Sequence, residues 1–256
     1  MSPSALALER DGAVLRVRLT RPERRNAFDA ALIAELTGAF ADVGDTRAVV
    51  LSGEGPSFCA GADVEWMRAS IDLSFDENVA DALRLRAMLE TIDACPAPVV
   101  ARIQGHALGG GCGLAACCDV VVAAEDAVFA FSEVKLGIVP AVISPFALAR
   151  IGPAAARRYF LTGERFDGPT ARRIGLVHEL VPGGELDAAV ERVVGELLSA
   201  GPEATRAAKR LVLDAPLSAE ETARRIAERR TSTEGQEGLR TFLERRSPSW
   251  SQTQGA

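Results

Sequence analysis

Two small-residue segments of this 256-residue chain could place backbone N–H groups against an anionic ligand. The first, GHALGGGCGL (105–114), follows a predicted strand and opens a predicted helix. Glycine lets a ligand approach the backbone closely, and the first N–H groups of a helix lack intrahelical partners. The second, LSGEGPSFCAGADVEWM (51–67), has a similar layout. If the fold brings the two bends together, their N–H groups would form an oxyanion hole, which stabilises negative charge that develops on an oxygen. Taken alone, the glycine run is equally compatible with tight helix-to-strand packing.

Glu133, in the segment FAFSEVKLG, is the carboxylate whose surroundings suit proton transfer. Its apolar neighbours in sequence are Phe129, Phe131, Val134 and Leu136. We expect these side chains to desolvate the carboxylate and raise its pKa, as a general acid or base at neutral pH requires. The alternative is that Ser132 caps a helical turn and Glu133 complements the helix dipole.

Other reactive side chains are assigned structural roles. His106 precedes the glycine run, and we expect it to make a structural hydrogen bond. Asp63 is predicted to cap or brace the loop after AGA. Cys59 and Cys112 have no evident base to activate them, so we interpret them as small apolar core residues.

The elements that must position these residues follow from hydrophobic patterning. The pattern predicts strands at 13–20, 47–53, 97–105 and 119–125, with helices at 31–43, 80–95 and 110–118 between them. Strands separated by helices predict an α/β fold with a mainly parallel sheet. From about residue 143 the pattern predicts helices at 143–151, 153–161, 168–174, 186–199, 203–213, 218–230 and 234–246. We therefore divide the chain into an α/β core, 1–200, and a helical C-terminal region, 201–256.

Composition excludes several classes of function. The net charge of −6 argues against a nucleic-acid partner, which would need a basic face. Five cysteines, two histidines and no C-x-x-C pair argue against a zinc site or a disulfide framework and favour a reducing compartment. We see no secretory signal and no apolar run long enough to span a membrane. We therefore expect a cytoplasmic protein without a membrane partner or bound metal.

Taken together, the motifs resemble the crotonase, or enoyl-CoA hydratase/isomerase, superfamily. FCAGAD and GHALGGGCGL carry the resemblance, and four further segments match in order: RPERRNAF (21–28), FAFSEVKLGIVP (129–140), FLTGERFDG (160–168) and AGPEATRAAKRLV (200–212). The resemblance implies a spiral of ββα units with a C-terminal helical trimerisation region, assembled as a homotrimer or a dimer of trimers. It also implies an acyl-CoA thioester whose carbonyl lies between the N–H groups of Ala62 and Gly110. Coenzyme A then belongs to the substrate, and no separate cofactor is expected.

The chain departs from the family pattern at Gly113. Hydratases of the family use two glutamates; Glu133 matches the second, and Gly113 stands where the first is expected. Our first hypothesis is an enoyl-CoA hydratase, a lyase that adds water to a 2-enoyl-CoA. The stretches that include Trp66, Met67 and 131–152 resemble the methylglutaconyl-CoA hydratase-like branch, which accepts branched or carboxylated acyl groups in leucine catabolism. The alternatives are a Δ3-Δ2-enoyl-CoA isomerase, which needs a single glutamate, and an inactive CoA-ester-binding homologue.

The resemblance also assigns substrate-binding positions. Arg24 matches a place where a cation lies near the CoA phosphates, although a solvated surface arginine is an equally good interpretation. Ala60 matches a backbone contact to adenine, and Phe242 resembles a residue that closes the acyl pocket, sometimes from a neighbouring subunit. Trp66 and Met67 could equally be core residues. The full set of predicted binding positions is Arg24, Ala27, Ala60, Gly61, Asp63, Val64, Trp66, Met67 and Phe242.

Overall fold

The computed structural model describes residues 4–254, and six strands form its main sheet. In sheet order these strands are β1 (Leu6–Asp11), β2 (Val14–Leu19), β3 (Ala48–Gly53), β4 (Val99–Ile103), β6 (Val120–Ala124) and β9 (Glu179–Val181). The β1–β2 pair is antiparallel, and the other neighbours are parallel. The parallel part confirms the predicted α/β class.

Strands of a smaller second sheet alternate along the chain with strands of the main sheet, so that the chain winds as a spiral of ββα turns. It contains β5 (His106–Leu108), β7 (Val128–Ala130) and β8 (Phe166–Asp167), and Cys59 forms an isolated bridge to Ala107. One turn runs from β4 through β5 to α4 (Gly110–Cys117). The next runs from β6 through β7 to η2 (Glu133–Leu136) and α5 (Ser144–Thr162). This arrangement brings the starts of α4 and η2 to the ends of neighbouring strands.

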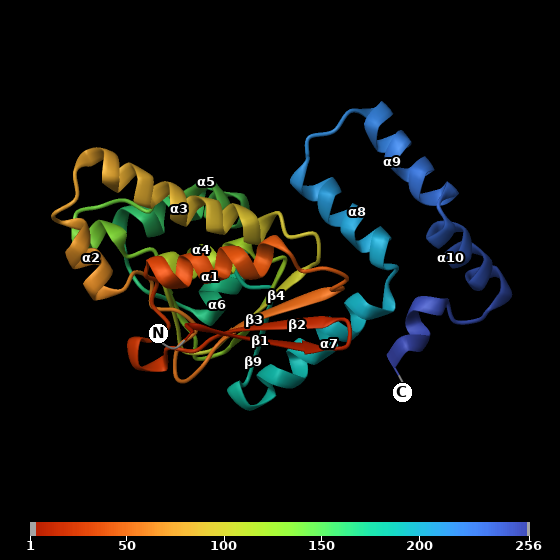
Figure 1. Cartoon of the computed structure of the whole chain (residues 1–256), viewed down its shortest axis with the longest axis horizontal. Helices are drawn as coiled ribbons and strands as arrows, with labels where there is room; N and C mark the ends of the chain where they lie inside the picture. The colour runs from red at the N-terminus through yellow and green to blue at the C-terminus, as the bar shows by residue number, and fades with distance from the viewer. Residues whose placement is uncertain (1–3, 255–256) are drawn as a thin grey trace.

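Helices cover both faces of the main sheet (Figure 1). On one face, side chains of β2–β4 pack with α1 (Ala30–Ala41), α3 (Phe75–Asp93) and α4 in the larger hydrophobic core. On the other face, Val50, Val100 and Val122 pack against α7 (Leu186–Ser199). The strands are buried on both faces, as is usual for parallel sheets with helical crossovers.

Three C-terminal helices project away from the α/β core (Figure 1). They are α8 (Pro202–Leu213), α9 (Ala219–Thr231) and α10 (Thr233–Glu244). Lys209 of α8 is buried and donates a hydrogen bond to Asp119 at 2.7 Å, which anchors α8 to the core. Arg47 donates to the carbonyls of Leu198 and Ala200 at 2.6 and 2.8 Å, where this region begins.

Most predicted helices are present, and the differences have local causes. Helix α3 begins at Phe75 rather than near residue 80, because Ser74 and Glu77 form a capping box. The helices predicted at 143–151 and 153–161 are joined in α5, and Gly152 breaks the helical geometry between them with φ 67°. The helix predicted at 168–174 is α6 (Gly168–Arg173), and the short helix α2 (Val64–Ser70) follows the bend of segment 51–67.

The strands β1, β5, β7, β8 and β9 were not predicted. A two-residue turn at Gly12 and Ala13 pairs β1 with β2, and Gly12 has the positive φ of 56° that such turns favour. The other four have only two or three residues each, and β9 pairs with β6 at the edge of the main sheet. None of the described helices combines the length and apolarity needed to cross a membrane.

Candidate active site

A cavity of about 310 Å³ lies where the small-residue bend of segment 51–67, α4 and η2 meet. The bend contributes Ala60, Gly61 and Ala62, and the start of α4 contributes Gly109 and Gly110. The remaining wall comes from α2, α3, Phe28 and the segment around and after Glu133: Phe28, Trp66, Met67, Ser70, Asn78, Asp81, Ala82, Leu85, Ser132, Leu136, Ile138, Val139, Pro140, Ala141, Val142 and Ile143.

The bend of segment 51–67 is fixed by backbone hydrogen bonds to residues 25–28. Ala60 N–H donates to the Arg25 carbonyl at 3.0 Å, and Phe28 N–H donates to the Gly61 carbonyl at 2.7 Å. Asp63 N–H donates back to the Phe28 carbonyl at 2.7 Å. The N–H of Ala62 shares a trans peptide with the Gly61 carbonyl and therefore points away from Phe28.

The two small-residue segments are in direct contact. A Cβ built on Gly61 would lie 2.8 Å from the Leu108 carbonyl oxygen and 3.7 Å from the backbone nitrogen of Gly110. A Cβ on Gly111 would lie 2.2 Å from the Cys59 carbonyl oxygen. Any side chain at these positions would force the segments apart, so glycine is needed for close packing as well as for access to the backbone. The close contact supports the packing interpretation of the glycines, and the ligand-binding interpretation stays a prediction.

The N–H groups of Ala62 and Gly110 have no hydrogen-bond partner among residues 4–254. The Gly109 carbonyl accepts from Cys112 and Gly113 at 2.9 and 3.2 Å, so it points into α4. The Gly110 N–H, on the opposite side of the same peptide, points out of the helix start. Two unpaired donors thus belong to adjacent stretches of the wall of one cavity, which is the arrangement that an oxyanion site requires.

The Glu133 carboxylate lies beside these donors. Its Oε1 is 3.2 Å from the position that a Cβ on Gly109 would occupy. Its Oε2 is buried without a hydrogen-bond partner among the described residues. Burial raises the pKa of Glu133, although a hydrogen bond from its own backbone N–H opposes the shift. The direction of the shift agrees with the sequence prediction.

The surroundings of Glu133 differ in part from those predicted. Leu136 lines the cavity, but the rings of Phe129 and Phe131 pack against Phe166 in the core. Ser132 makes no side-chain hydrogen bond to cap η2, so it does not fulfil the capping role considered as the alternative.

Gly113 does not face the cavity. A Cβ on Gly113 would lie 2.4 Å from Cγ2 of Ile143 and 3.9 Å from Cδ1 of Leu89. The side chain of Ile143 therefore occupies the space into which a residue at 113 would project, and Ile143 itself lines the cavity. Glu133 is consequently the only carboxylate at the donor end of the cavity within residues 4–254.

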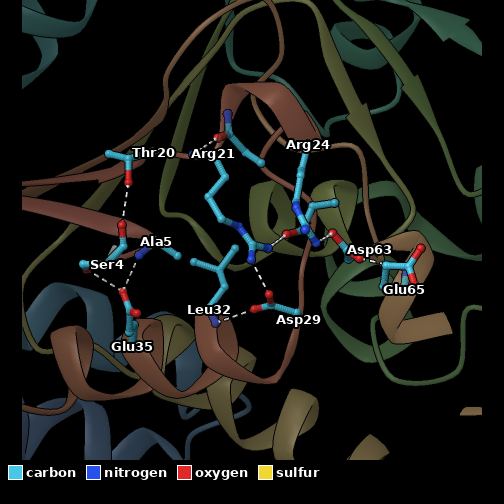
Figure 2. Close-up of polar contacts among 12 residues, drawn as sticks. Ser4, Ala5, Thr20, Arg21, Arg24, Asp29, Leu32, Glu35, Asp63 and Glu65 are labelled. Carbon is cyan, nitrogen blue, oxygen red and sulfur yellow. Dashed lines mark hydrogen bonds and ion pairs between the residues drawn. The ribbon is translucent and has the colours of Figure 1, made fainter. Parts of the chain in front are cut away.

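Four predicted binding residues lie beside the cavity wall rather than in it. Arg24 forms an ion pair with Asp63 at 3.0 Å (Figure 2). Asp63 also caps α2 by accepting from Glu65 N–H at 2.8 Å, as predicted. Partial burial opposes ionisation of Asp63, but the hydrogen bonds from Arg24 and Glu65 lower its pKa overall. Ala27 is buried, whereas Val64 is exposed.

Phe242 is separated from the cavity within one chain. Its side chain is 81% exposed on α10, and α10 lies at the opposite end of the molecule from α2 (Figure 1). A role in closing the acyl pocket would therefore require a second copy of the chain.

The remaining reactive side chains have the structural surroundings expected of them. His106 Nδ1 lies 3.3 Å from the Ser57 hydroxyl oxygen. Cys59 and Cys112 are buried, and burial raises the pKa of Cys59 to about 12. Trp66 and Met67 line the cavity, and Trp66 also packs against the core.

Sequence reasoning missed four residues that shape the site. Asn26 is buried and donates to the carbonyls of Glu54 and Ser57 at 3.0 and 2.8 Å, which ties the 21–28 loop to segment 51–67. Phe28 packs against Gly110, 2.6 Å from the position of a Cβ there. Ile143 and Asp81 also line the cavity. The RPERRNAF motif could have pointed to Asn26 and Phe28, which lie within it. No local sequence pattern marks Ile143 or Asp81 as site residues.

The ββα spiral, the two unpaired backbone donors and the partly buried Glu133 beside them are typical of the crotonase class. The sequence model of the Enoyl-CoA hydratase/isomerase family matches residues 9–254, and the chain belongs to this family. It is 34% identical over 259 residues to the crotonyl-CoA hydratase of Syntrophomonas wolfei, and the match covers 96% of this chain and 97% of that protein.

Solved structures agree with the fold. An enoyl-CoA hydratase from Shewanella pealeana gives a TM-score of 0.91 at 39% identity and covers 96% of each chain. Pseudomonas aeruginosa AtuE gives a TM-score of 0.92 at 39% identity, over 96% of this chain and 99% of that chain.

Proposed function

We propose that this protein is an enoyl-CoA hydratase that adds water to a 2-enoyl-CoA thioester. The observation that carries the proposal is the position of Glu133: its buried carboxylate lies beside the helix start that presents the free Gly110 N–H. A thioester oxygen held by the N–H groups of Ala62 and Gly110 would place the adjacent Cα within reach of this carboxylate.

A single carboxylate is sufficient for both halves of hydration. Ionised Glu133 accepts a proton from water as the water oxygen bonds to Cβ. The electrons of the Cα–Cβ double bond move onto the thioester oxygen, where the two N–H donors stabilise the enolate. Protonated Glu133 then returns the proton to Cα, which restores the carbonyl and regenerates the carboxylate. The similarity to enoyl-CoA hydratases, including the crotonyl-CoA hydratase of Syntrophomonas wolfei, supports this assignment over other enolate reactions.

The second candidate function is Δ3-Δ2-enoyl-CoA isomerisation, and the packing of Gly113 favours it. With Ile143 in the place of a second carboxylate, Glu133 is the one carboxylate of the described residues available at the donor end to orient water. Isomerisation needs no water: Glu133 removes a proton from Cα of a 3-enoyl ester and returns it to Cγ of the dienolate. An inactive CoA-ester-binding protein is the third candidate, and it leaves the unpartnered Glu133 unexplained.

One assay separates the three functions. The protein is incubated with crotonyl-CoA, 3-methylglutaconyl-CoA and a 3-enoyl-CoA, and the absorbance of the conjugated thioester is followed with product analysis. Loss of conjugation with a 3-hydroxy product supports hydration, and gain of conjugation from the 3-enoyl ester supports isomerisation. Binding of CoA esters without turnover of any substrate would overturn both enzymatic proposals.

The matched variants are Glu133→Gln and Glu125→Gln. Glu125 is exposed on the turn after β6 and makes no side-chain hydrogen bond within the described residues. Removal of a general acid–base should lower turnover by about 10²- to 10⁴-fold in Glu133→Gln, whereas Glu125→Gln should match the wild type. Full turnover by Glu133→Gln would remove the assignment of the proton-transfer residue.

The assembly and the CoA contacts belong to the same proposal. Arg24 is half exposed despite its ion pair, so it is free to contact a CoA phosphate at the cavity mouth.

Exposed apolar side chains on α9 and α10 support association through these helices into a trimer or a dimer of trimers: Ile226, Leu239, Phe242 and Leu243. In such an assembly Phe242 would reach the cavity of a neighbouring copy.

A further inference from the structure

The ionisable side chains that line the cavity are all acidic. Of the residues that line it within 4–254, only Glu133 and Asp81 carry ionisable acidic groups, and no lysine, arginine or histidine is among them. Glu133 is assigned to proton transfer. Asp81 is therefore a charged group of the cavity wall that the proposed reaction does not use.

Asp81 lies on the wall that would hold the acyl chain. Asp81, Leu85 and Leu89 follow one another at four-residue spacing on α3, so they share one face of the helix. Leu89 reaches the Gly113 position, and Asp81 is eight residues earlier, about 12 Å along the helix axis. Asp81 is consequently too far from Gly113 to replace the missing glutamate.

Besides Asp81, helices α2 and α3 contribute the polar residues Ser70 and Asn78 and the small residue Ala82 to the cavity wall. The thioester end is fixed by the donors and Glu133, which leaves the wall between α2, α3 and residues 136–143 for the acyl group.

The cation that pairs with Asp81 is not part of the cavity lining. Arg84 donates to the Asp81 carboxylate at 2.8 Å, and its own side chain is 60% exposed and absent from the cavity lining. The Asp81 side chain is only 14% exposed. An acyl chain that ended in a carboxylate would therefore meet a like charge in a partly desolvated pocket without a cation from the wall. Such a contact discriminates between substrates through repulsion.

We propose that Asp81 excludes carboxylated acyl groups and that the substrate is an enoyl-CoA with an uncharged, largely apolar acyl chain. This inference rests on the proposed function. It favours the simple or branched 2-enoyl esters over the carboxylated, methylglutaconyl-like esters that the sequence resemblance left open. Leu85, Leu136 and Val142 provide apolar contacts for such a chain.

The test compares two esters that differ in one terminal group. We would measure kcat/KM for trans-2-hexenoyl-CoA and for its ω-carboxylated counterpart, trans-2-hexenedioyl-CoA, with the wild type, Asp81→Asn and Asp81→Leu. The wild type should prefer the neutral ester by at least about 30-fold, because the second carboxylate would face Asp81 with no cation of the cavity wall to pair with it. Either substitution should reduce this preference by about tenfold, mainly through a lower KM for the carboxylated ester.

The control variant is Asp76→Asn, which removes the same charge from the exposed first turn of α3 outside the cavity. It should leave the preference unchanged. A wild-type preference near one, or a preference that Asp81→Asn and Asp81→Leu do not alter, would overturn the proposal. So would a selective loss of activity toward the carboxylated ester in Arg84→Gln, because Arg84 would then be binding that carboxylate.

Failure of the proposed function would be recognised separately. If neither 2-enoyl ester reacts, the hydratase assignment fails, and the selectivity of Asp81 is measured from the Kd values of hexanoyl-CoA and adipoyl-CoA. Equal Kd values for these two saturated esters in the wild type would overturn the selectivity as well.

Discussion

The contact between Gly113 and Ile143 makes a quantitative prediction about stability. In Gly113→Ala the new Cβ would lie 2.4 Å from Cγ2 of Ile143, whereas carbon atoms in favourable contact are about 3.5–4.0 Å apart. The side chain of Ile143 must therefore move by about 1 Å, and such overpacking costs about 1–3 kcal/mol. Replacing a helical glycine by alanine returns about 0.5–1 kcal/mol. We expect a net destabilisation of about 1 kcal/mol, the difference between these two effects.

The second substitution of the cycle removes the clashing atom. Ile143→Ala alone should cost about 2–3 kcal/mol, near the lower end for truncation of a buried isoleucine, because this side chain borders a cavity. With Cγ2 gone, the nearest atom to the new Cβ is the Cβ of residue 143 at 3.0 Å, so most of the clash disappears and the alanine introduced by Gly113→Ala keeps most of the benefit of its helix propensity. The double variant should therefore be more stable than the sum of the single effects predicts, by about 2 kcal/mol.

The measurement is the free energy of unfolding from urea titration of the wild type, both single variants and the double variant at one protein concentration. Gly38→Ala is the matched control, because Gly38 lies in the exposed interior of α1 and a Cβ there would contact nothing within 4 Å. This control should be stabilised by about 0.5–1 kcal/mol. Additive effects within about 0.5 kcal/mol in the Gly113–Ile143 cycle would refute the proposed packing.

Three further predictions concern buried ionisable groups. Burial raises the pKa of Glu133, so as pH rises above its ordinary value of 4.5 the unfolded chain loses the proton first, which favours unfolding. Glu133→Gln should therefore gain stability over the wild type between about pH 4 and pH 7, by about 1 kcal/mol, in urea titrations at several pH values; a pH-independent difference would contradict this. The five buried thiols, with the pKa of Cys59 raised to about 12, should resist a disulfide reagent at pH 8 until denaturant is added, and rapid reaction of any thiol in the folded protein would count against their burial. Lys209→Met should destabilise the protein by about 2 kcal/mol because it removes the ion-pair partner of Asp119. The loss is smaller than for a fully buried ion pair because Asp119 is partly exposed. The exposed Arg224 pair provides the comparison, and Arg224→Met should change stability by less than about 0.5 kcal/mol.

Patterns within one element were predictable from the sequence because their causes are local. The start of α4 at Gly110 and the break at Gly152 follow from glycine between hydrophobic runs. The antiparallel strand β1 was missed, although Gly12 at the first position of its two-residue turn is a typical signal, because only the first three residues of the strand are apolar and they do not alternate with polar ones. Strand β9 has only three residues, too short to give a periodic signal.

The residues of the site were predictable as types, but their relations were not. Two glycine-rich bends and one carboxylate with apolar sequence neighbours could be identified from residue types alone, and the family motifs related them to thioester chemistry. The folded chain was needed to show that Gly61 packs against Gly110, that Ile143 fills the space beside Gly113 and that Asp81 lines the same cavity as Glu133. These residues are separated by tens of positions along the chain. Whether such distant side chains meet depends on how the successive spiral turns pack, and no local sequence preference encodes that contact.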